Sequence, residues 1–180
     1  MKQHLNLTRK ASEPYRLAMQ PRDWQTKILD RADMAAERER LRGTGQTVAM
    51  TNGCFDVLHS GHLNTLTHAR AQGDMLVVGL NDDASVRLLK GDTRPIIPEA
   101  ERARMLASLE VVDYVVLFEE KEVTPLIAQI KPDVLVKGGD WAHLVVGREV
   151  VEAYGGRIDL APIAEERSTT NIIERIRERP

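Results

Sequence analysis

Short apolar runs alternate along most of the chain with segments whose apolar residues recur at helical spacing. The runs are continuous rather than alternating with polar residues, which is typical of strands buried on both faces of a sheet. Met75-Leu76-Val77-Val78 is one example. We therefore expect buried strands at residues 47–51, 74–80, 114–118, 134–137 and 157–160.

The segments between these runs carry the signals of helix starts. Asp82-Asp83-Ala84-Ser85 can cap one helix, and Pro98 suits the first turn of another. The spacing predicts helices at residues 61–72, 82–89, 98–109, 122–130, 147–154 and 170–179.

This alternation predicts an α/β fold, namely a Rossmann-like, doubly wound, five-stranded parallel sheet with helices on both faces. Ligands bind such sheets outside the carboxyl ends of the strands, where the strand order reverses. The loops after the first, second, fourth and fifth strands are therefore expected to face the functional site.

The N-terminal part of the chain has a different pattern. Residues 1–22 are polar, contain Pro14 and Pro21 and show no clear period, so we expect a loose arm. A ragged apolar stripe over residues 23–42 predicts a helix, which Gly43-Thr44-Gly45 ends. We therefore divide the chain into an N-terminal arm and helix, residues 1–43, and a second domain, residues 44–180. The first part has no functional explanation.

Composition limits the class of protein. The 180 residues carry a net charge of −2, so there is no general basic field and no nucleic-acid partner is expected. Cys54 is the single cysteine, which excludes an intramolecular disulfide and is compatible with a reducing compartment. The first residues lack a signal peptide, and no apolar run approaches bilayer length. We expect a cytoplasmic protein with no membrane partner.

The segment Gly53-Cys54-Phe55-Asp56-Val57-Leu58-His59-Ser60-Gly61-His62 lies between the first predicted strand and the following helix. Its two histidines, three residues apart at a helix N-terminus, lie on one face. That end of a helix also presents free N–H groups and the positive end of the dipole. Imidazoles and free amides together suit a phosphate chain, so the segment indicates transfer of a nucleotidyl group.

The chemistry of that transfer fits the absence of a catalytic triad or a kinase signature in the sequence. A phosphate monoester, whose second pKa is about 6, is already ionised near neutral pH and can attack the α-phosphorus without a general base. The difficulty is electrostatic, because two anions must meet and charge develops on phosphorus. Positioned donors must therefore supply the catalysis.

These motifs resemble a known family. Thr51-Asn52-Gly53-Cys54-Phe55-Asp56 with His59-Ser60-Gly61-His62 is similar to the HxGH signature of the cytidylyltransferase-like nucleotidyltransferases. Further motifs resemble the branch that transfers an adenylyl group to D-glycero-β-D-manno-heptose 1-phosphate. They are Leu89-Lys90-Gly91-Asp92-Thr93-Arg94-Pro95, Lys131-Pro132-Asp133, Val136-Lys137-Gly138-Gly139-Asp140 and Ser168-Thr169-Thr170-Asn171-Ile172-Ile173. The resemblance covers about residues 44–178.

The resemblance implies a role for each matched residue. Catalytic roles fall to His59, His62, Lys90 and Arg102. Nucleotide binding falls to Thr51, Asn52, Gly53, Phe55, Gly61, Lys137, Gly138, Ser168, Thr169 and Thr170. Contacts to the sugar phosphate fall to Asp56, Arg94 and Asp140. The implied substrates are ATP and a sugar 1-phosphate, Mg²⁺ arrives with the nucleotide, no protein metal site is expected, and the family-based expectation for assembly is a homodimer.

Several alternatives remain open. Asp56 can instead hold a loop amide, Arg102 can form a surface ion pair, and the hydroxyls of residues 168–170 can simply cap the last helix. Glu166 stands where relatives usually carry glycine, which puts the phosphate contacts there in doubt. The rival enzymes are a cytidylyltransferase acting on glycerol 3-phosphate or a phospho-alcohol and a guanylyltransferase acting on a sugar phosphate. A non-catalytic nucleotide-binding sensor is the rival from another class.

Overall fold

A computed structural model describes residues 22–139, 145–162 and 169–178, and five parallel strands form its sheet. In chain order the strands are β1 (Val48–Gly53), β2 (Met75–Asn81), β3 (Tyr114–Phe118), β4 (Val134–Gly138) and β5 (Arg157–Ala161). Their order across the sheet is β3-β2-β1-β4-β5, and all four pairings are parallel. The predicted Rossmann-like α/β class is confirmed, and the strand bounds agree with the predicted ones to within two residues.

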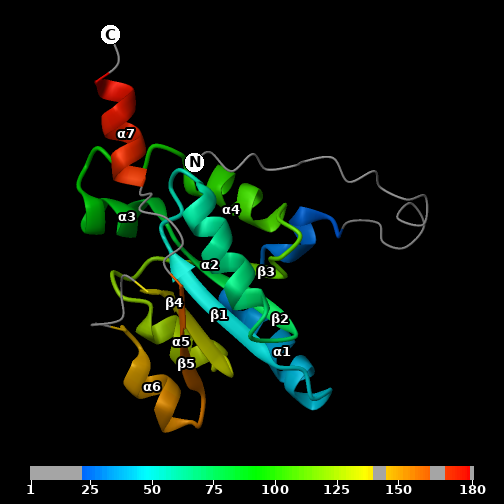
Figure 1. Cartoon of the computed structure of the whole chain (residues 1–180). Coiled ribbons are helices and arrows are strands. Elements are labelled where there is room, and N and C mark those ends of the chain that lie inside the picture. The colour runs from blue at the N-terminus through cyan, green and yellow to red at the C-terminus, as the bar shows by residue number, and fades with distance from the viewer. Residues whose placement is uncertain (1–21, 140–144, 163–168, 179–180) are drawn as a thin grey trace, which may run out of the picture.

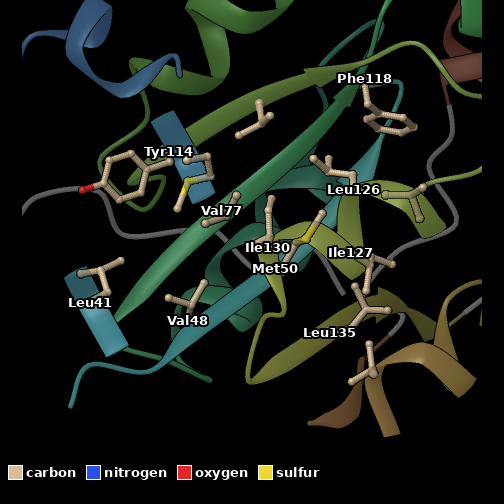
Figure 2. Close-up of a cluster of buried hydrophobic side chains, with 14 of the residues drawn as sticks. Leu41, Val48, Met50, Val77, Tyr114, Phe118, Leu126, Ile127, Ile130 and Leu135 are labelled. Atoms are coloured by element: carbon tan, nitrogen blue, oxygen red, sulfur yellow. The ribbon is translucent and has the colours of Figure 1, made fainter. Parts of the chain in front are cut away.

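Helices cover both faces of this sheet (Figure 1). The α-helices are α1 (Arg31–Gly43), α2 (Ser60–Arg70), α3 (Asp83–Lys90), α4 (Glu99–Ala107), α5 (Thr124–Ile130), α6 (Arg148–Ala153) and α7 (Thr169–Arg177). Helices α1, α5 and α6 pack on one face, where their apolar side chains form a cluster with Met50, Val77 and Leu135 (Figure 2). Helices α2 and α4 pack on the other face around Ala49, Val78 and Val136.

Neighbouring residues of β1 pack into different hydrophobic clusters, one on each face of the sheet. Val48 and Met50 belong to the cluster under α1 and α5, whereas Ala49 between them belongs to the cluster under α2. All three side chains are completely buried. Because successive side chains of a strand point to opposite faces, a sheet covered on both faces needs an unbroken apolar run.

The helix predicted over residues 23–42 is wrong in its first part. A short 3-10 helix, η2 (Trp24–Lys27), comes first, and α1 begins only at Arg31. Between them Ile28 forms a parallel bridge with Val115 of the edge strand β3. Asp30 then caps α1, since its carboxylate accepts from the amide of Asp33 at 2.8 Å. Helix α1 buries Met34 and Leu41 in the core, and the division of the chain at residue 43 stays a prediction.

The strand order reverses between β1 and β4. From β1 the chain adds β2 and β3 on one side, then crosses back to add β4 and β5 on the other. The carboxyl ends of β1 and β4, at Gly53 and Gly138, therefore border the position where this type of sheet binds its ligands.

Candidate functional site

The turn after β1 is shaped by a glycine and an aromatic ring. Phe55 has a φ of 45°, a left-handed conformation that places its ring against Gly53. A Cβ on Gly53 would lie 3.3 Å from Cε2 of that ring, a tight contact that would require the ring to shift by a few tenths of an ångström. Phe55 is buried and also packs against His62, with ring centroids 5.1 Å apart. The ring thus fixes the turn that leads into α2.

The two histidines meet at the start of α2, as the sequence predicted. His59 is the N-cap residue of α2, and its ring stacks on that of His62 with centroids 3.9 Å apart and an interplanar angle of 25°. Gly61 lies between them in the first turn. The two imidazole rings and the positive end of the α2 dipole therefore occupy the same corner of the molecule.

Burial controls the charge of His62. Desolvation, and then the neighbouring His59, lower the pKa of His62 to about 4, so the ring is neutral at pH 7. Its Nδ1 atom is buried and has no hydrogen-bond partner within the described residues. A proton on Nδ1 would therefore have no acceptor, which favours the neutral tautomer that carries its proton on Nε2. In that form His62 is a hydrogen-bond donor without being a cation.

A half-buried lysine lies across the point where the strand order reverses. Lys137, near the end of β4, donates from Nζ to Oδ1 of Asn52 at the end of β1. Burial lowers the pKa of Lys137 to about 8, so the ammonium group remains mostly charged at neutral pH. Asn52 and Lys137, both predicted to bind nucleotide, thus lie together. Thr51 is buried behind them, and Gly138 pairs with Ala161 of β5.

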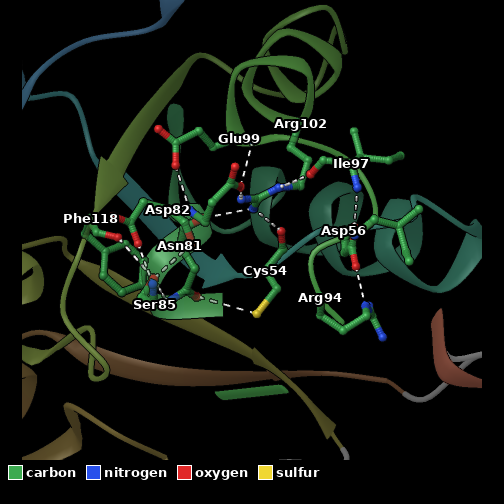
Figure 3. A network of polar contacts seen from close by, with 12 residues as sticks. Cys54, Asp56, Asn81, Asp82, Ser85, Arg94, Ile97, Glu99, Arg102 and Phe118 are labelled. Carbon is green, nitrogen blue, oxygen red and sulfur yellow. Dashed lines mark hydrogen bonds and ion pairs between the residues drawn. The ribbon is translucent and has the colours of Figure 1, made fainter. Parts of the chain in front are cut away.

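Arg102 has a different environment from the one the resemblance implied. Its side chain is completely buried on α4 and donates to four protein acceptors (Figure 3). These are the carbonyls of Cys54 at 2.6 Å, Asn81 at 2.8 Å and Ile97 at 2.9 Å, and the carboxylate of Asp83 at 2.7 Å. The guanidinium therefore connects the turn after β1, the end of β2 and the segment before α4, and it is neither on the surface nor open to a phosphate.

Arg102 belongs to a polar cluster, here called the brace, with two acidic residues, Asp83 and Glu99. The sequence analysis assigned neither acidic residue a role in this cluster. Asp83 and Glu99 cap each other's helix, because the amide of Asp83 donates to Glu99 at 2.7 Å and the amide of Glu99 donates to Asp83 at 2.9 Å. Both residues stand at the first position of a helix, where the helix dipole favours a carboxylate. Their pairing across sixteen residues of chain carries no local signal.

Asp56 and Arg94 form an ion pair at the same edge of the sheet. Asp56 is buried, and one of its oxygens accepts from Nε of Arg94 at 2.5 Å. Its other oxygen accepts from the amides of Ile96 and Ile97. The carboxylate is thus fully used within the protein, in agreement with the alternative that Asp56 holds loop amides.

Lys90 ends α3 and is exposed. Burial raises the pKa of the Cys54 thiol, while the charge of Lys90 opposes that rise, so the lysine lies close enough to act on the turn after β1. A half-buried thiol with a raised pKa agrees with Cys54 as a small filler of the turn rather than a nucleophile.

Helix α7 brings the C-terminal motif to the same corner. Oγ1 of Thr169, the first residue of α7, donates to the carbonyl of Val57 at 3.2 Å, and Thr170 is exposed beside it. Figure 1 shows the start of α7 next to the segment that enters α2. Asp140, Glu166 and Ser168, which the sequence analysis singled out, lie outside the described residues.

The assembled corner suits a polyanion. It combines two imidazole rings, the N-terminus of a helix, a half-buried ammonium group and hydroxyls from α7. Within the described ranges no group of three or more His, Cys, Asp or Glu side chains has the arrangement of a metal site. None of the described helices is long and apolar enough to cross a membrane. Donors without a metal cluster can hold phosphate groups, whose own oxygens are the ligands that Mg²⁺ prefers.

Comparisons with known proteins agree with this chemistry. A family model described as cytidylyltransferase-like matches residues 50–175. Bifunctional protein HldE of Pelobacter propionicus is 52% identical over 164 residues, which cover 91% of this chain and 34% of that protein. Bifunctional protein HldE of Geotalea uraniireducens is 54% identical over 156 residues, which cover 86% and 31%. The chain spans about a third of the length of these curated relatives.

Solved structures give the same picture. The lipopolysaccharide core biosynthesis protein of Thermoplasma volcanium superposes with a TM-score of 0.55 at 28% identity, covering 68% of this chain and all of that one. Pantoate-beta-alanine ligase of Francisella tularensis gives a TM-score of 0.59 at 18% identity, covering 79% of this chain and 68% of the ligase. The second likeness shows the fold alone.

Proposed function

Since the chain belongs to the cytidylyltransferase-like family, we propose that it joins ATP and D-glycero-β-D-manno-heptose 1-phosphate to give ADP-heptose and pyrophosphate. The observation that carries the proposal is the stacked pair of His59 and His62 at the N-terminus of α2, which follows the strand whose Asn52 contacts Lys137. The motifs at residues 131–140 and 168–173 support the heptose substrate, as do relatives named HldE and a structural neighbour named for lipopolysaccharide core biosynthesis. The reaction then supplies heptose for the lipopolysaccharide core.

In this reaction a phosphate oxygen of the sugar 1-phosphate attacks the α-phosphorus of ATP. A new P–O bond forms to the sugar phosphate, and the bond between the α-phosphorus and the bridging oxygen breaks to release pyrophosphate. The nucleophile is already ionised, so the protein does not need to remove a proton. His59 and His62 donate to oxygens of the α- and β-phosphates, where charge develops in the transition state.

The remaining residues bind and orient the nucleotide. Lys137 supplies a positive charge at the carboxyl ends of the central strands, held in place by Asn52. Gly53 and Gly61 allow the backbone to approach the phosphates, and Thr169 and Thr170 present hydroxyls and amides to the β- and γ-phosphates. Lys90, from the exposed end of α3, reaches the same phosphates. Asp140 and Ser168 remain proposals from the resemblance alone.

Mg²⁺ enters the proposal as the partner of ATP. The triphosphate oxygens would hold most of its coordination sphere. When bound, the ion neutralises charge on the phosphates and on the leaving pyrophosphate. A homodimer in the cytoplasm is the expected state of the protein, and it stays a prediction from the resemblance and the sequence.

A pyrophosphate-release assay with four nucleoside triphosphates and a panel of sugar and alcohol phosphates tests the substrates. We expect turnover with ATP and the heptose 1-phosphate. Turnover only with CTP and glycerol 3-phosphate would make the protein a cytidylyltransferase, and turnover only with GTP would make it a guanylyltransferase. Nucleotide binding without any turnover would favour a sensor.

Substituting His62→Ala tests the role of the stacked pair. We expect kcat to fall by about a hundredfold or more, the usual cost of losing a transition-state donor. The fold and the affinity for ATP should change only slightly, because the interaction forms in the transition state. His68→Ala is the matched control, since His68 lies on the same helix and is bonded to Asp159 at 2.5 Å. An unchanged kcat in His62→Ala would refute the role.

A further inference from the structure

The buried carboxylate of Asp56 organises the loop between α3 and α4. Its Oδ1 atom accepts from the amides of Ile96 at 2.7 Å and Ile97 at 2.9 Å. Its Oδ2 atom accepts from Nε of Arg94 at 2.5 Å. The side chain of Asp56 is 1% exposed, so neither oxygen remains available for a substrate hydroxyl. Asp56 thus connects the turn that leads into α2 with the loop that carries Arg94.

Arg94 keeps most of its hydrogen-bonding capacity unused. A guanidinium has five N–H donors, and the ion pair with Asp56 uses only the one on Nε. No described residue accepts from either terminal nitrogen, although the side chain is only 14% exposed. In Figure 3 these terminal nitrogens point away from Asp56 and away from the acceptors around Arg102. The ion pair therefore fixes the plane of the guanidinium and leaves its terminal nitrogens without an acceptor among the described residues.

That outer edge has the geometry for one anion type in particular. The two terminal nitrogens of an arginine form a rigid fork that bonds two oxygens of a phosphate at once. The fork lies on the loop that Asp56 attaches to the turn after β1, and this turn continues into the histidine pair. A phosphate bound there would lie near the turn that leads to the histidine pair.

We propose that Asp56 is a positioning residue that aims the terminal nitrogens of Arg94 at the phosphate of the sugar 1-phosphate substrate. This inference rests on the proposed function, and it changes the role of Asp56, which binds no substrate itself. Arg94 is then the residue that holds the attacking phosphate, while His59, His62 and Lys137 hold the triphosphate. Asp56 and Arg94 act as one unit, so their effects on sugar phosphate binding must be coupled.

Steady-state kinetics with both substrates test the proposal in wild-type protein and in Asp56→Asn. An asparagine keeps an oxygen for the two loop amides but faces Arg94 with a second donor, so the ion pair is lost. We expect the KM for the sugar phosphate to rise about tenfold, the scale of one charge-assisted hydrogen bond, with the KM for ATP within about twofold. Asp92→Asn, an exposed carboxylate of the same loop, should leave both constants unchanged.

The double variant Asp56→Asn/Arg94→Gln separates positioning from general structural damage. If Asp56 acts through Arg94, the double variant has about the same sugar phosphate KM as Arg94→Gln alone. Independent effects that multiply, or equal increases in both KM values, would overturn the proposal. If Asp56→Asn does not fold, Arg94→Lys replaces it. Lysine keeps the charge without the fork, so a wild-type KM in Arg94→Lys would also overturn the proposal.

These outcomes are distinguishable from failure of the proposed function. Wild-type protein that turns over none of the sugar phosphates would refute the function, and the inference with it. Wild-type turnover without the expected coupling would refute the inference alone.

Discussion

Arg102 is a large cation held entirely by protein acceptors. Burial of a guanidinium is favourable only when its donors are satisfied, and here three carbonyls and one carboxylate satisfy them. Those carbonyls lie in segments that are far apart in sequence, at Cys54, Asn81 and Ile97. The residue therefore stabilises the geometry of the whole carboxyl edge rather than contacting the nucleotide.

Replacing Arg102 by methionine should lower the free energy of unfolding by about 3 kcal/mol or more, because it leaves buried carbonyls without donors. Urea unfolding measures this. Arg104→Met, an exposed position on the same helix, should cost about 1 kcal/mol or less even though Arg104 lies over the ring of Trp24. A stable Arg102→Met protein with greatly reduced turnover would instead place Arg102 against the phosphates.

Lys137 should give the pH profile an alkaline limb. Its pKa is lowered from 10.5 to about 8, so the ammonium is present below that pH and lost as the pH rises through it. We expect kcat/KM for ATP, which reports groups of the free protein, to fall above about pH 8. Lys137→Arg should move the limb to higher pH, because arginine stays charged. Lys121→Arg, an exposed control, should not move it, and an identical limb in both variants would contradict the assignment.

The sequence identified the residues with local signatures and missed those defined by long-range contacts. The two histidines are three residues apart at a helix start, so spacing alone predicted that they lie on one face, and the structure adds that their rings stack. The brace of Arg102, Asp83 and Glu99 joins segments separated by up to 48 residues, so no spacing rule indicates it. Arg102 directly precedes the buried Ala103 and lies one helical turn before the buried Leu106, so it lies on the buried face of α4, a signal that the sequence analysis did not use.

At the scale of elements, strands were predicted more closely than the N-terminal helix. Strands buried on both faces produce an apolar run whose ends are sharp in the sequence. The residues before α1 also contain apolar side chains, but Ile28 pairs with Val115 and Asp30 begins a new helix. Apolar residues in this segment can either continue a helix or pair with the edge strand β3. The periodicity of the segment cannot show which, because the partner strand lies about ninety residues away in the sequence.

The packing of α2's C-terminal loop against β1 gives a test at this scale. A Cβ on Gly73 would lie 2.8 Å from the backbone nitrogen of Ala49, so Gly73→Ala must displace backbone. We expect a loss of about 1–3 kcal/mol in the free energy of unfolding, as for other overpacked sites. Gly43→Ala, where nothing lies within 4 Å, should be neutral or stabilise the protein by up to about 1 kcal/mol. Equal unfolding free energies in the two variants would contradict the packing described.

At the scale of the whole molecule, a slightly acidic protein assembles a local site for anions. The net charge is −2, yet Lys90, Arg94 and Lys137 gather with the two histidines around the carboxyl edge of the sheet. Parallel topology explains the gathering, because residues after different strands return to the same edge. The parallel topology thus explains why these residues share one edge. It does not explain why Asp56 binds the loop before α4, which depends on individual side-chain contacts.

The Lys131-Pro132-Asp133 motif lies at the amino ends of the strands, opposite the edge that carries the histidine pair. Asp133 accepts from the amide of Val48 at 2.7 Å and from Arg38 at 2.8 Å, so it joins the starts of β1 and β4 to α1. A pocket of about 350 Å³ lies there, lined by Arg38, Arg42, Lys131, Asp133, Tyr154, Gly155 and Gly156. This pocket lies at the amino ends of the strands, opposite the proposed site. The location of bound nucleotide therefore decides between the two positions.

A crystal structure of the protein with Mg²⁺ and a non-hydrolysable ATP analogue is therefore the most direct test of the central claim. We expect the triphosphate against the N-terminus of α2, with the α- and β-phosphates within hydrogen-bond distance of His59 and His62 and near Lys137. Density for the triphosphate in the pocket at the amino edge, or anywhere away from the histidine pair, would contradict the proposed function.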